Sequence, residues 1–265
     1  MEVIILKNAE SVAATACELV SELIRVQTDA VLGLATGSTQ MALYRRLVEE
    51  YQDGSLSFKQ VTTFNLDEYL GVAADNPQSY RSYMNRQFFD RIDIDKRNTF
   101  LPCCGEGENP RLVGPRYEQR IREAGGIDLQ LMGIGHNGHI GFNEPSSSLR
   151  SRTRVKTLTK QTLKDNSRMF VKDEFQPKLA ITMGIATIMD ARRILLLATG
   201  ENKAGAVQKT IEGPISAMCP ASVLQMHERV TVLLDEGAAA GLSNRDYYDW
   251  THLQNEALKD RFSDK

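Results

Sequence analysis

Cysteine, histidine and tryptophan are scarce in this chain of 265 residues, which has four cysteines, four histidines and one tryptophan. The cysteines, at Cys17, Cys103, Cys104 and Cys219, show neither metal-ligand spacing nor a C-x-x-C pair. A bridge between the adjacent Cys103 and Cys104 is not expected. Reduced thiols in a cytoplasmic protein are the simplest interpretation.

The chain also lacks long apolar runs and an excess of charge of either sign. No stretch approaches the roughly 18–20 apolar residues that a membrane-spanning helix needs, and Met1–Lys7 turns polar too early for a signal peptide. The formal net charge is −2, which gives no basic footprint for nucleic acid. We therefore expect no membrane or nucleic-acid partner, and we expect anionic ligands to be bound by local groups.

The composition does provide enough apolar material for a core. Hydrophobic residues make up 42% and charged residues 25% of the chain, which is typical of globular proteins. A chain of this length buries roughly 70–75% of the surface that it exposes when unfolded. No linker, repeat or low-complexity segment is visible. We expect one α/β domain over residues 1–265, with a polar helical arm at about 243–265.

Apolar, strand-like runs alternate with helix-like segments along the whole chain. This alternation predicts βαβ units, and therefore an open, mostly parallel, Rossmann-like sheet with helices on both faces. The expected strands are 3–6, 30–35, 61–66, 127–132, 155–158, 179–183, 193–198 and 230–234. The expected helices are one capped by Asn8 and those at 41–51, 78–89, 115–124, 163–170, 185–190 and 203–212.

A glycine-rich segment, Gly133–Pro145, follows the apolar run 127–132 directly. Its four glycines allow sharp turns, and it gathers His136, Asn137, His139 and Glu144 within a short span. Loops at the carboxyl ends of parallel strands are where open α/β sheets bind ligands. We therefore interpret this segment as the centre of a functional site. The alternative is a surface turn with chance polar residues.

Two other strand ends offer compatible chemistry. Thr36–Thr39 lies between an expected strand and a helix, where hydroxyls, free backbone N–H groups and the positive helix end suit a phosphate. It is neither a Walker A nor a G-x-G-x-x-G motif, and a plain capping turn explains it equally well. Asp67, followed by Glu68, closes the strand at 61–66 and is a candidate general base. The alternative is a solvated acidic pair.

Arg168 and Lys203 are candidates for the cationic side of an anion site. Lys203 follows a strand and a glycine turn, and so belongs to the same edge of the predicted sheet. Taken alone, each residue is more simply a solvated surface charge.

Together these segments resemble the glucosamine-6-phosphate deaminases (isomerases). The resemblance is carried by Leu34–Thr39, Phe64–Tyr69 and Gly133–Pro145, and it extends from the first strand to about Leu234. The related 6-phosphogluconolactonases share the fold and a G-x-D-G-H loop. They lack the Asp-Glu-Tyr strand end and the Phe-Asn-Glu-Pro continuation.

The resemblance implies conversion of glucosamine 6-phosphate and water into fructose 6-phosphate and ammonia, with no metal or organic cofactor. It implies that His139 opens the sugar ring with help from Glu144, and that Asp67 moves the C2 proton to C1. Many members have Asp where this chain has Asn137, which can orient His139 but adds no charge. A comparable change in serine proteases costs about 10⁴ in kcat, and we expect less here because sugars also open spontaneously. His136 is expected to be only a neighbour.

Two binding sets follow from the same resemblance. The substrate phosphate is expected at Thr36, Gly37, Ser38, Thr39, Arg168 and Lys203. An allosteric set, which in regulated members binds N-acetylglucosamine 6-phosphate between subunits, is expected at Ser147, Arg154, Lys156 and Thr157, with Tyr247 or Tyr248 as an added tyrosine. The second set would imply a homo-oligomer, a hexamer if allosteric. Its alternative is a solvated basic strand.

Two rival functions remain at this stage. One is a lactonase that hydrolyses 6-phosphogluconolactone with the same phosphate loop and histidine. The other is a sugar-phosphate sensor without catalytic activity, which the absence of a helix-turn-helix extension or a basic patch disfavours.

Overall fold

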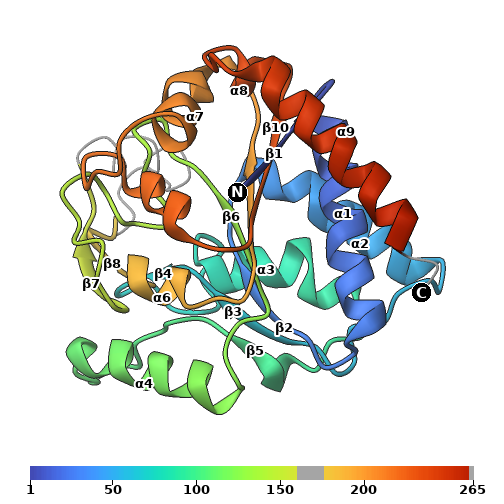
Figure 1. Ribbon diagram of the computed structural model, residues 1–265. Helices are drawn as coiled ribbons and strands as arrows, with labels where there is room; N and C mark the ends of the chain where they lie inside the picture. Colours follow the sequence, from blue (N-terminus) through green and yellow to red (C-terminus); the bar gives the residue numbers. More distant parts are fainter. Residues whose placement is uncertain (160–175, 263–265) are drawn as a thin grey trace.

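A parallel sheet runs through the centre of the protein in a computed structural model, which describes residues 1–159 and 176–262 (Figure 1). Seven strands are hydrogen-bonded in parallel pairs, so the expected open, mostly parallel sheet is confirmed. In spatial order they are β1 (Glu2–Leu6), β10 (Val230–Asp235), β9 (Ile194–Ala198), β6 (Leu129–Gly133), β2 (Val31–Leu34), β3 (Thr62–Asn65) and β5 (Thr99–Phe100).

Helices cover both faces of this sheet because its central strands are apolar on both sides. In β9, Leu195 and Leu197 point into one buried cluster, and Leu196 points into the other. The first cluster is completed by α1 (Ala9–Val26), α2 (Ser38–Gln52) and α3 (Tyr80–Gln87). The second is completed by α4 (Pro110–Glu123), α6 (Ile185–Met189), α7 (Ala204–Ile211) and α8 (Glu236–Ala239).

Capping side chains decide where several helices begin. The Asn8 side chain accepts a hydrogen bond from the Ser11 backbone N–H at 2.9 Å, which confirms Asn8 as the cap of α1. Helix α4 begins at Pro110, behind an Asn109 cap, and not at Pro115 as expected. Proline is favoured in the first turn of a helix. Because the chain has prolines at both 110 and 115, the sequence allowed either one to mark the helix start. Short 3₁₀ helices lie at Phe89–Arg91, Lys96–Asn98, Glu201–Lys203 and Pro220–Met226.

A second, smaller sheet was not predicted. It contains β4 (Asp67–Tyr69), β8 (Leu179–Thr182) and β7 (Arg154–Thr157), paired antiparallel with β8 in the centre. The segment 179–183 was expected to pair in parallel with the main sheet, and that expectation was wrong. Strands of three or four residues carry too little periodicity to reveal their partners. The predicted helix 163–170, with Arg168, lies outside the described residues.

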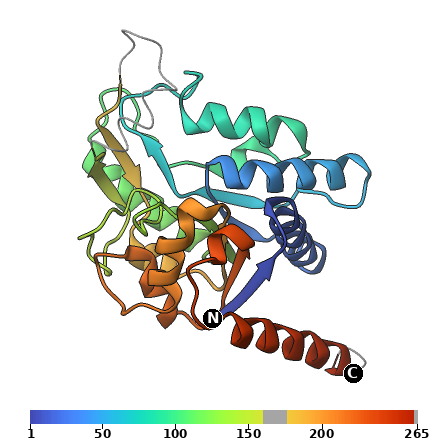
Figure 2. The ribbon, with the colours of Figure 1, turned by 90° about the horizontal axis from the view of Figure 1, so that it is seen from above.

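The C-terminal helix α9 (Arg245–Phe262) runs past β1, at the edge of the main sheet (Figures 1 and 2). The Asn255 side-chain amide donates to the Glu2 carboxylate at 3.3 Å. Tyr248 donates its hydroxyl to Glu212 at 3.2 Å, whereas Tyr247 is 60% exposed. The four cysteines are free thiols. Within the described part of the chain, no helix is long and apolar enough to cross a membrane.

Candidate active site

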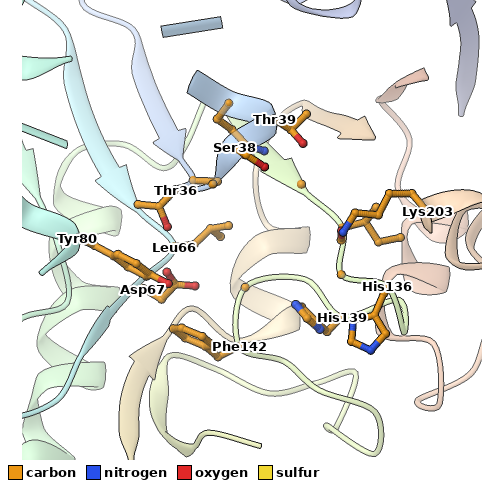
Figure 3. Close-up of a pocket in the computed structure, with 17 residues that line it drawn as sticks. Thr36, Ser38, Thr39, Leu66, Asp67, Tyr80, His136, His139, Phe142 and Lys203 are labelled. Atoms are coloured by element: carbon orange, nitrogen blue, oxygen red, sulfur yellow. The ribbon is translucent and has the colours of Figure 1, made fainter. Parts of the chain in front are cut away.

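The carboxyl ends of β2, β3, β6 and β9 surround a cavity of about 310 Å³ (Figure 3). It is lined by residues 35–40, Leu66, Asp67, Tyr80, 133–136, His139, Gly141, Phe142 and Lys203. Figure 3 shows Asp67 and Tyr80 on one side, His139 and Lys203 on the other, and Ser38 and Thr39 at the start of α2. The three strand-end motifs and the lysine therefore converge, as the parallel sheet required.

Three side chains of the glycine-rich loop form a hydrogen-bonded series. His139 Nδ1 lies 2.7 Å from Asn137 Oδ1, and Asn137 Nδ2 donates to Glu144 Oε2 at 2.8 Å. Glu144 is 8% exposed, and its Oε2 lies 3.5 Å from His139 Nδ1. Glu144 and Asn137 thus stand behind the histidine and do not line the cavity.

This series fixes the proton positions on the imidazole. An ionised carboxylate only accepts hydrogen bonds, so Glu144 turns the amide NH₂ of Asn137 towards itself and the amide oxygen towards His139. The oxygen accepts the proton of Nδ1, which leaves Nε2 as a base. Asn137 adds no charge, as expected, but Glu144 supplies a negative charge 3.5 Å from the same ring nitrogen.

Two glycines of the loop are required by close approach. A Cβ atom on Gly135 would lie 2.1 Å from Cε1 of His139, so the imidazole packs directly against the glycine backbone. Gly138 has a φ of 84°, and a Cβ there would lie 2.5 Å from Cys219 Sγ. A larger residue at Gly135 would collide with the imidazole, and one at Gly138 would be strained by the positive φ and would collide with Cys219.

Asp67 enters the cavity from the first position of β4, directly after the chain leaves the main sheet. It is 7% exposed. Burial, together with the negative charge of Glu68, raises the pKa of Asp67 to about 8. A Cβ on Gly141 would lie 3.2 Å from Asp67 Oδ2, so the glycine-rich loop passes close to this carboxylate.

The adjacent Glu68 has a structural position. Its carboxylate accepts hydrogen bonds from the backbone N–H groups of Tyr69, Tyr80 and Arg81, at 2.8 to 2.9 Å. It therefore caps the start of α3, and burial raises its pKa while these N–H groups lower it. The alternative of a solvated acidic pair was wrong, because both side chains are buried.

The pH dependence of stability provides a test of the buried Asp67. Its pKa is about 8 in the folded protein and 3.8 ordinarily, so between these values the folded state binds more protons than the unfolded state. The free energy of unfolding therefore falls as pH rises through this window. We expect Asp67→Asn to melt at a higher Tm than the wild type, by a margin that grows from about pH 5 to about pH 9. Asp249→Asn, on the exposed face of α9, is the control, and parallel Tm curves for Asp67→Asn and wild type would contradict the burial argument.

The opposite side of the cavity offers donors for an anion. Helix α2 begins at Ser38, three residues earlier than expected, so Ser38 and Thr39 lie in its first turn with unpaired backbone N–H groups. Lys203 donates from Nζ to the Ile134 carbonyl at 2.8 Å, and burial lowers its pKa. Arg168, the other expected cation, lies outside the described residues.

Sequence reasoning missed or undervalued three cavity residues. Tyr80 lines the cavity next to Asp67, and burial raises its pKa well above the ordinary value. Gln40 is 2% exposed, and its Nε2 has no partner among the described residues. His136, expected to be only a neighbour, also lines the cavity, with its ring 6.4 Å from that of His139. Gln40 and Tyr80 could have been found from their positions in the chain. Both lie in the first turn of a helix at the edge of the sheet that carries the cavity.

The expected allosteric residues lie on the small sheet and beside it. Arg154, Lys156 and Thr157 belong to β7. Ser147 is 4% exposed, and its hydroxyl has no partner in the described part of the chain. Arg154 donates to the Asn143 side chain at 2.9 Å, and burial lowers its pKa. Arg154 is therefore hydrogen-bonded to Asn143, the residue that precedes Glu144. This contact does not fit the alternative in which Arg154 is a fully solvated charge.

The fold and this geometry define an α/β protein with one cavity in which a carboxylate and imidazoles face a helix start and a lysine. Within residues 1–159 and 176–262, no group of three or more His, Cys, Asp or Glu side chains could hold a metal ion. A family model for glucosamine-6-phosphate isomerases and 6-phosphogluconolactonases matches residues 7–233. The chain belongs to this family.

Within the family, the chain belongs with the glucosamine-6-phosphate deaminases, which confirms the resemblance seen in the sequence. It is 59% identical to such a deaminase from Colwellia psychrerythraea (strain 34H), over 99% of this chain and 98% of the relative. The deaminase from Shewanella woodyi is 55% identical, over 99% of both chains.

Solved structures agree at the level of the fold. A monomeric glucosamine-6-phosphate deaminase superposes with a TM-score of 0.87 at 46% identity, over 91% of this chain and all of that one. A 6-phosphogluconolactonase from Trypanosoma brucei superposes with a TM-score of 0.68 at 23% identity, over 91% of this chain and 98% of that one. The second likeness shows the shared fold alone.

Proposed function

We propose that residues 1–265 form one cytoplasmic catalytic domain that converts glucosamine 6-phosphate and water into fructose 6-phosphate and ammonia. The observation that carries this proposal is the single cavity that joins Asp67 and His139 to the start of α2 and Lys203. The closely similar relatives that bear the name glucosamine-6-phosphate deaminase support it.

Ring opening is the first step of the proposed mechanism. His139 Nε2 accepts the proton of the sugar O1 hydroxyl and delivers a proton to the ring oxygen. The imidazolium that forms in between is stabilised by Glu144, 3.5 Å from Nδ1, while Asn137 keeps the ring oriented. No metal or organic cofactor has a role in this step.

Proton transfer between carbons is the second step. Ionised Asp67 removes the proton from C2 and returns it to C1, by way of a cis-enediol(amine), after which water replaces the C2 nitrogen as ammonia. Burial disfavours the ionised form of Asp67 in the empty cavity. The C2 ammonium group of the bound substrate has the opposite charge and therefore lowers the pKa of Asp67. Asp67 thus becomes ionised, and able to act as a base, when the substrate binds.

The 6-phosphate is bound, in this proposal, by Thr36, Gly37, Ser38 and Thr39 together with Lys203 and Arg168. All of these residues except Arg168 line the cavity. Four of them lie at or just before the start of α2, and the fifth is the half-buried Lys203. Because the phosphate does not react, its binding energy positions C1 and C2 between Asp67 and His139.

Lys203→Met is expected to raise KM by about 10- to 100-fold and to change kcat much less. A hydrogen bond to a charged group contributes about 1.5–3 kcal/mol, and the phosphate is present in both ground and transition states. Steady-state kinetics provide the measurement. Lys209→Met, an exposed lysine on α7, the helix that directly follows Lys203, is the matched control and should behave like the wild type. A loss confined to kcat would remove Lys203 from phosphate binding.

One coupled assay tests the proposed function against its closest rival. Purified protein is given glucosamine 6-phosphate, and both fructose 6-phosphate and ammonia are followed. In parallel it is given 6-phosphogluconolactone, and acid release is followed. We expect the first reaction only, with equal amounts of both products. Lactone hydrolysis without deamination would favour the lactonase function, and folded protein inactive in both assays would favour a sensor.

A regulatory role for Ser147, Arg154, Lys156 and Thr157 remains a prediction, and a specific contact favours it. A ligand that draws Arg154 away from Asn143 would disturb the loop that carries Glu144. We expect sigmoidal kinetics that become hyperbolic with N-acetylglucosamine 6-phosphate, in a hexamer observed by analytical ultracentrifugation. A similar deaminase has been described as monomeric, and hyperbolic kinetics from a monomer that ignores this compound would reject the site.

A further inference from the structure

A second cavity, of about 300 Å³, lies at the carboxyl end of β5 between α3 and α4. Figure 1 shows β5 and α4 side by side at the lower edge of the molecule. Three arginines line this cavity, namely Arg81 from α3 and Arg116 and Arg120 from α4, and no carboxylate is among its lining residues. We propose that this arginine cavity binds the phosphate group of a small anionic metabolite.

The arginines are held in place by the surrounding structure. Val113, Arg116, Tyr117 and Arg120 follow the spacing of one helical face, so α4 presents both of its arginines to the same cavity. Arg81 donates to the side-chain oxygen and to the backbone carbonyl of Thr99, both at 2.7 Å. Such fixed guanidinium groups lose little conformational freedom on binding a ligand.

The positive charge of the arginine cavity is only partly neutralised. Arg116 forms a salt bridge with Glu108. Arg81 meets neutral oxygen atoms of Thr99, and Arg120 lies over the Phe100 ring, 5.2 Å from its centre. In the described part of the chain, neither Arg81 nor Arg120 forms a salt bridge, and burial lowers the pKa of Arg81. Glu68 acts on Arg81, and Glu108 acts on Arg120, through space and without a direct ion pair. An anion in the cavity would supply both arginines with a closer counter-charge.

The shape of the cavity favours a compact phosphate. A guanidinium group presents paired N–H donors that match two phosphate oxygens, and several can share one phosphate. The Phe100 ring stacks on Phe64, with centroids 5.1 Å apart, and is also covered by Arg120, so it offers no free platform for a nucleobase. The volume is close to the 310 Å³ of the catalytic cavity, enough for a ligand of similar size.

The test separates this cavity from the catalytic one by using a variant of each. Pyrophosphate is titrated calorimetrically into Lys203→Met, in which the catalytic anion site is weakened. We expect one equivalent to bind, and we expect Arg120→Ala, added to that variant, to weaken binding at least tenfold. Arg122→Ala, an exposed arginine on the same helix outside the cavity, is the matched control and should leave the affinity unchanged.

A second substitution and a second anion complete the design. Arg116→Gln, on a partly exposed side chain, should also weaken pyrophosphate binding, and citrate should bind more weakly than pyrophosphate. The proposal is overturned if Lys203→Met binds no pyrophosphate, or if Arg120→Ala and Arg122→Ala weaken binding equally. Citrate binding as tight as that of pyrophosphate would overturn the assignment to phosphate. Because Arg120 does not line the catalytic cavity, Arg120→Ala alone should deaminate glucosamine 6-phosphate at the wild-type rate.

Discussion

Asp67→Asn is expected to lower kcat by about 10³–10⁴-fold, at the upper end of what a positioned acid–base group contributes. The amide keeps the shape of the carboxylate but cannot accept a proton from C2. Because the buried site needs no charge for its fold, the variant should remain folded. It should still bind glucosamine 6-phosphate through the 6-phosphate, with a Kd weakened only by the lost contact between Asp67 and the C2 ammonium. The direct measurement is incorporation of solvent deuterium at C2, followed by NMR, which the variant should not catalyse.

The neighbouring carboxylate provides the control for this experiment. Glu68 does not line the cavity, and its oxygens bind the backbone at the start of α3. Glu68→Gln should therefore lower Tm and keep kcat within about tenfold of the wild type, since it loses a helix cap and no catalytic group. Persistent deuterium exchange in Asp67→Asn, or a larger kcat loss in Glu68→Gln, would assign the base to another residue.

His139→Gln is expected to lower kcat by about 10²–10³-fold, because the sugar must then open with little help. The loss should be smaller than for Asp67→Asn, since sugars also open spontaneously. Once the sugar is open, Asp67 should still exchange the C2 proton. The measurement is kcat for the cyclic substrate, with His136→Gln as the matched control. His136 lines the same cavity but has no bond to Asn137 or Glu144 in the described part of the chain, so its loss should cost only a few-fold.

The hydrogen-bonded series behind His139 can be tested by a double-mutant cycle. In the proposed mechanism, Glu144 acts on the substrate only through the histidine, by way of Asn137 and the ring nitrogen 3.5 Å away. Glu144→Gln should therefore reduce kcat in the wild type but have little effect when His139 is already glutamine, because groups that act as a unit are not additive. Additive losses would show that Glu144 has a separate role.

The fold and most of the site were predictable because they depend on local patterns. Apolar runs of four to six residues, such as Leu129–Gly133 and Ile194–Ala198, identify strands that are buried on both faces. Parallel strands carry their ligand loops at one edge, so the sequence alone predicts that Thr36, Asp67, His139 and Lys203 lie together, as they do in the cavity. The small sheet was missed because its strands, of three or four residues each, are too short to show a periodic pattern.

The amino-acid sequence by itself determined the class of fold, the edge at which the site lies and the family resemblance. Only the tertiary structure decided what each polar side chain does. It separated Asp67, which enters the cavity, from Glu68, which caps a helix, although both are buried acids in consecutive positions. It also placed Glu144 close enough to His139 to supply the charge that Asn137 lacks. Such roles depend on distances between residues remote in the chain and on burial, which change pKa values and hydrogen bonding and which no local pattern contains.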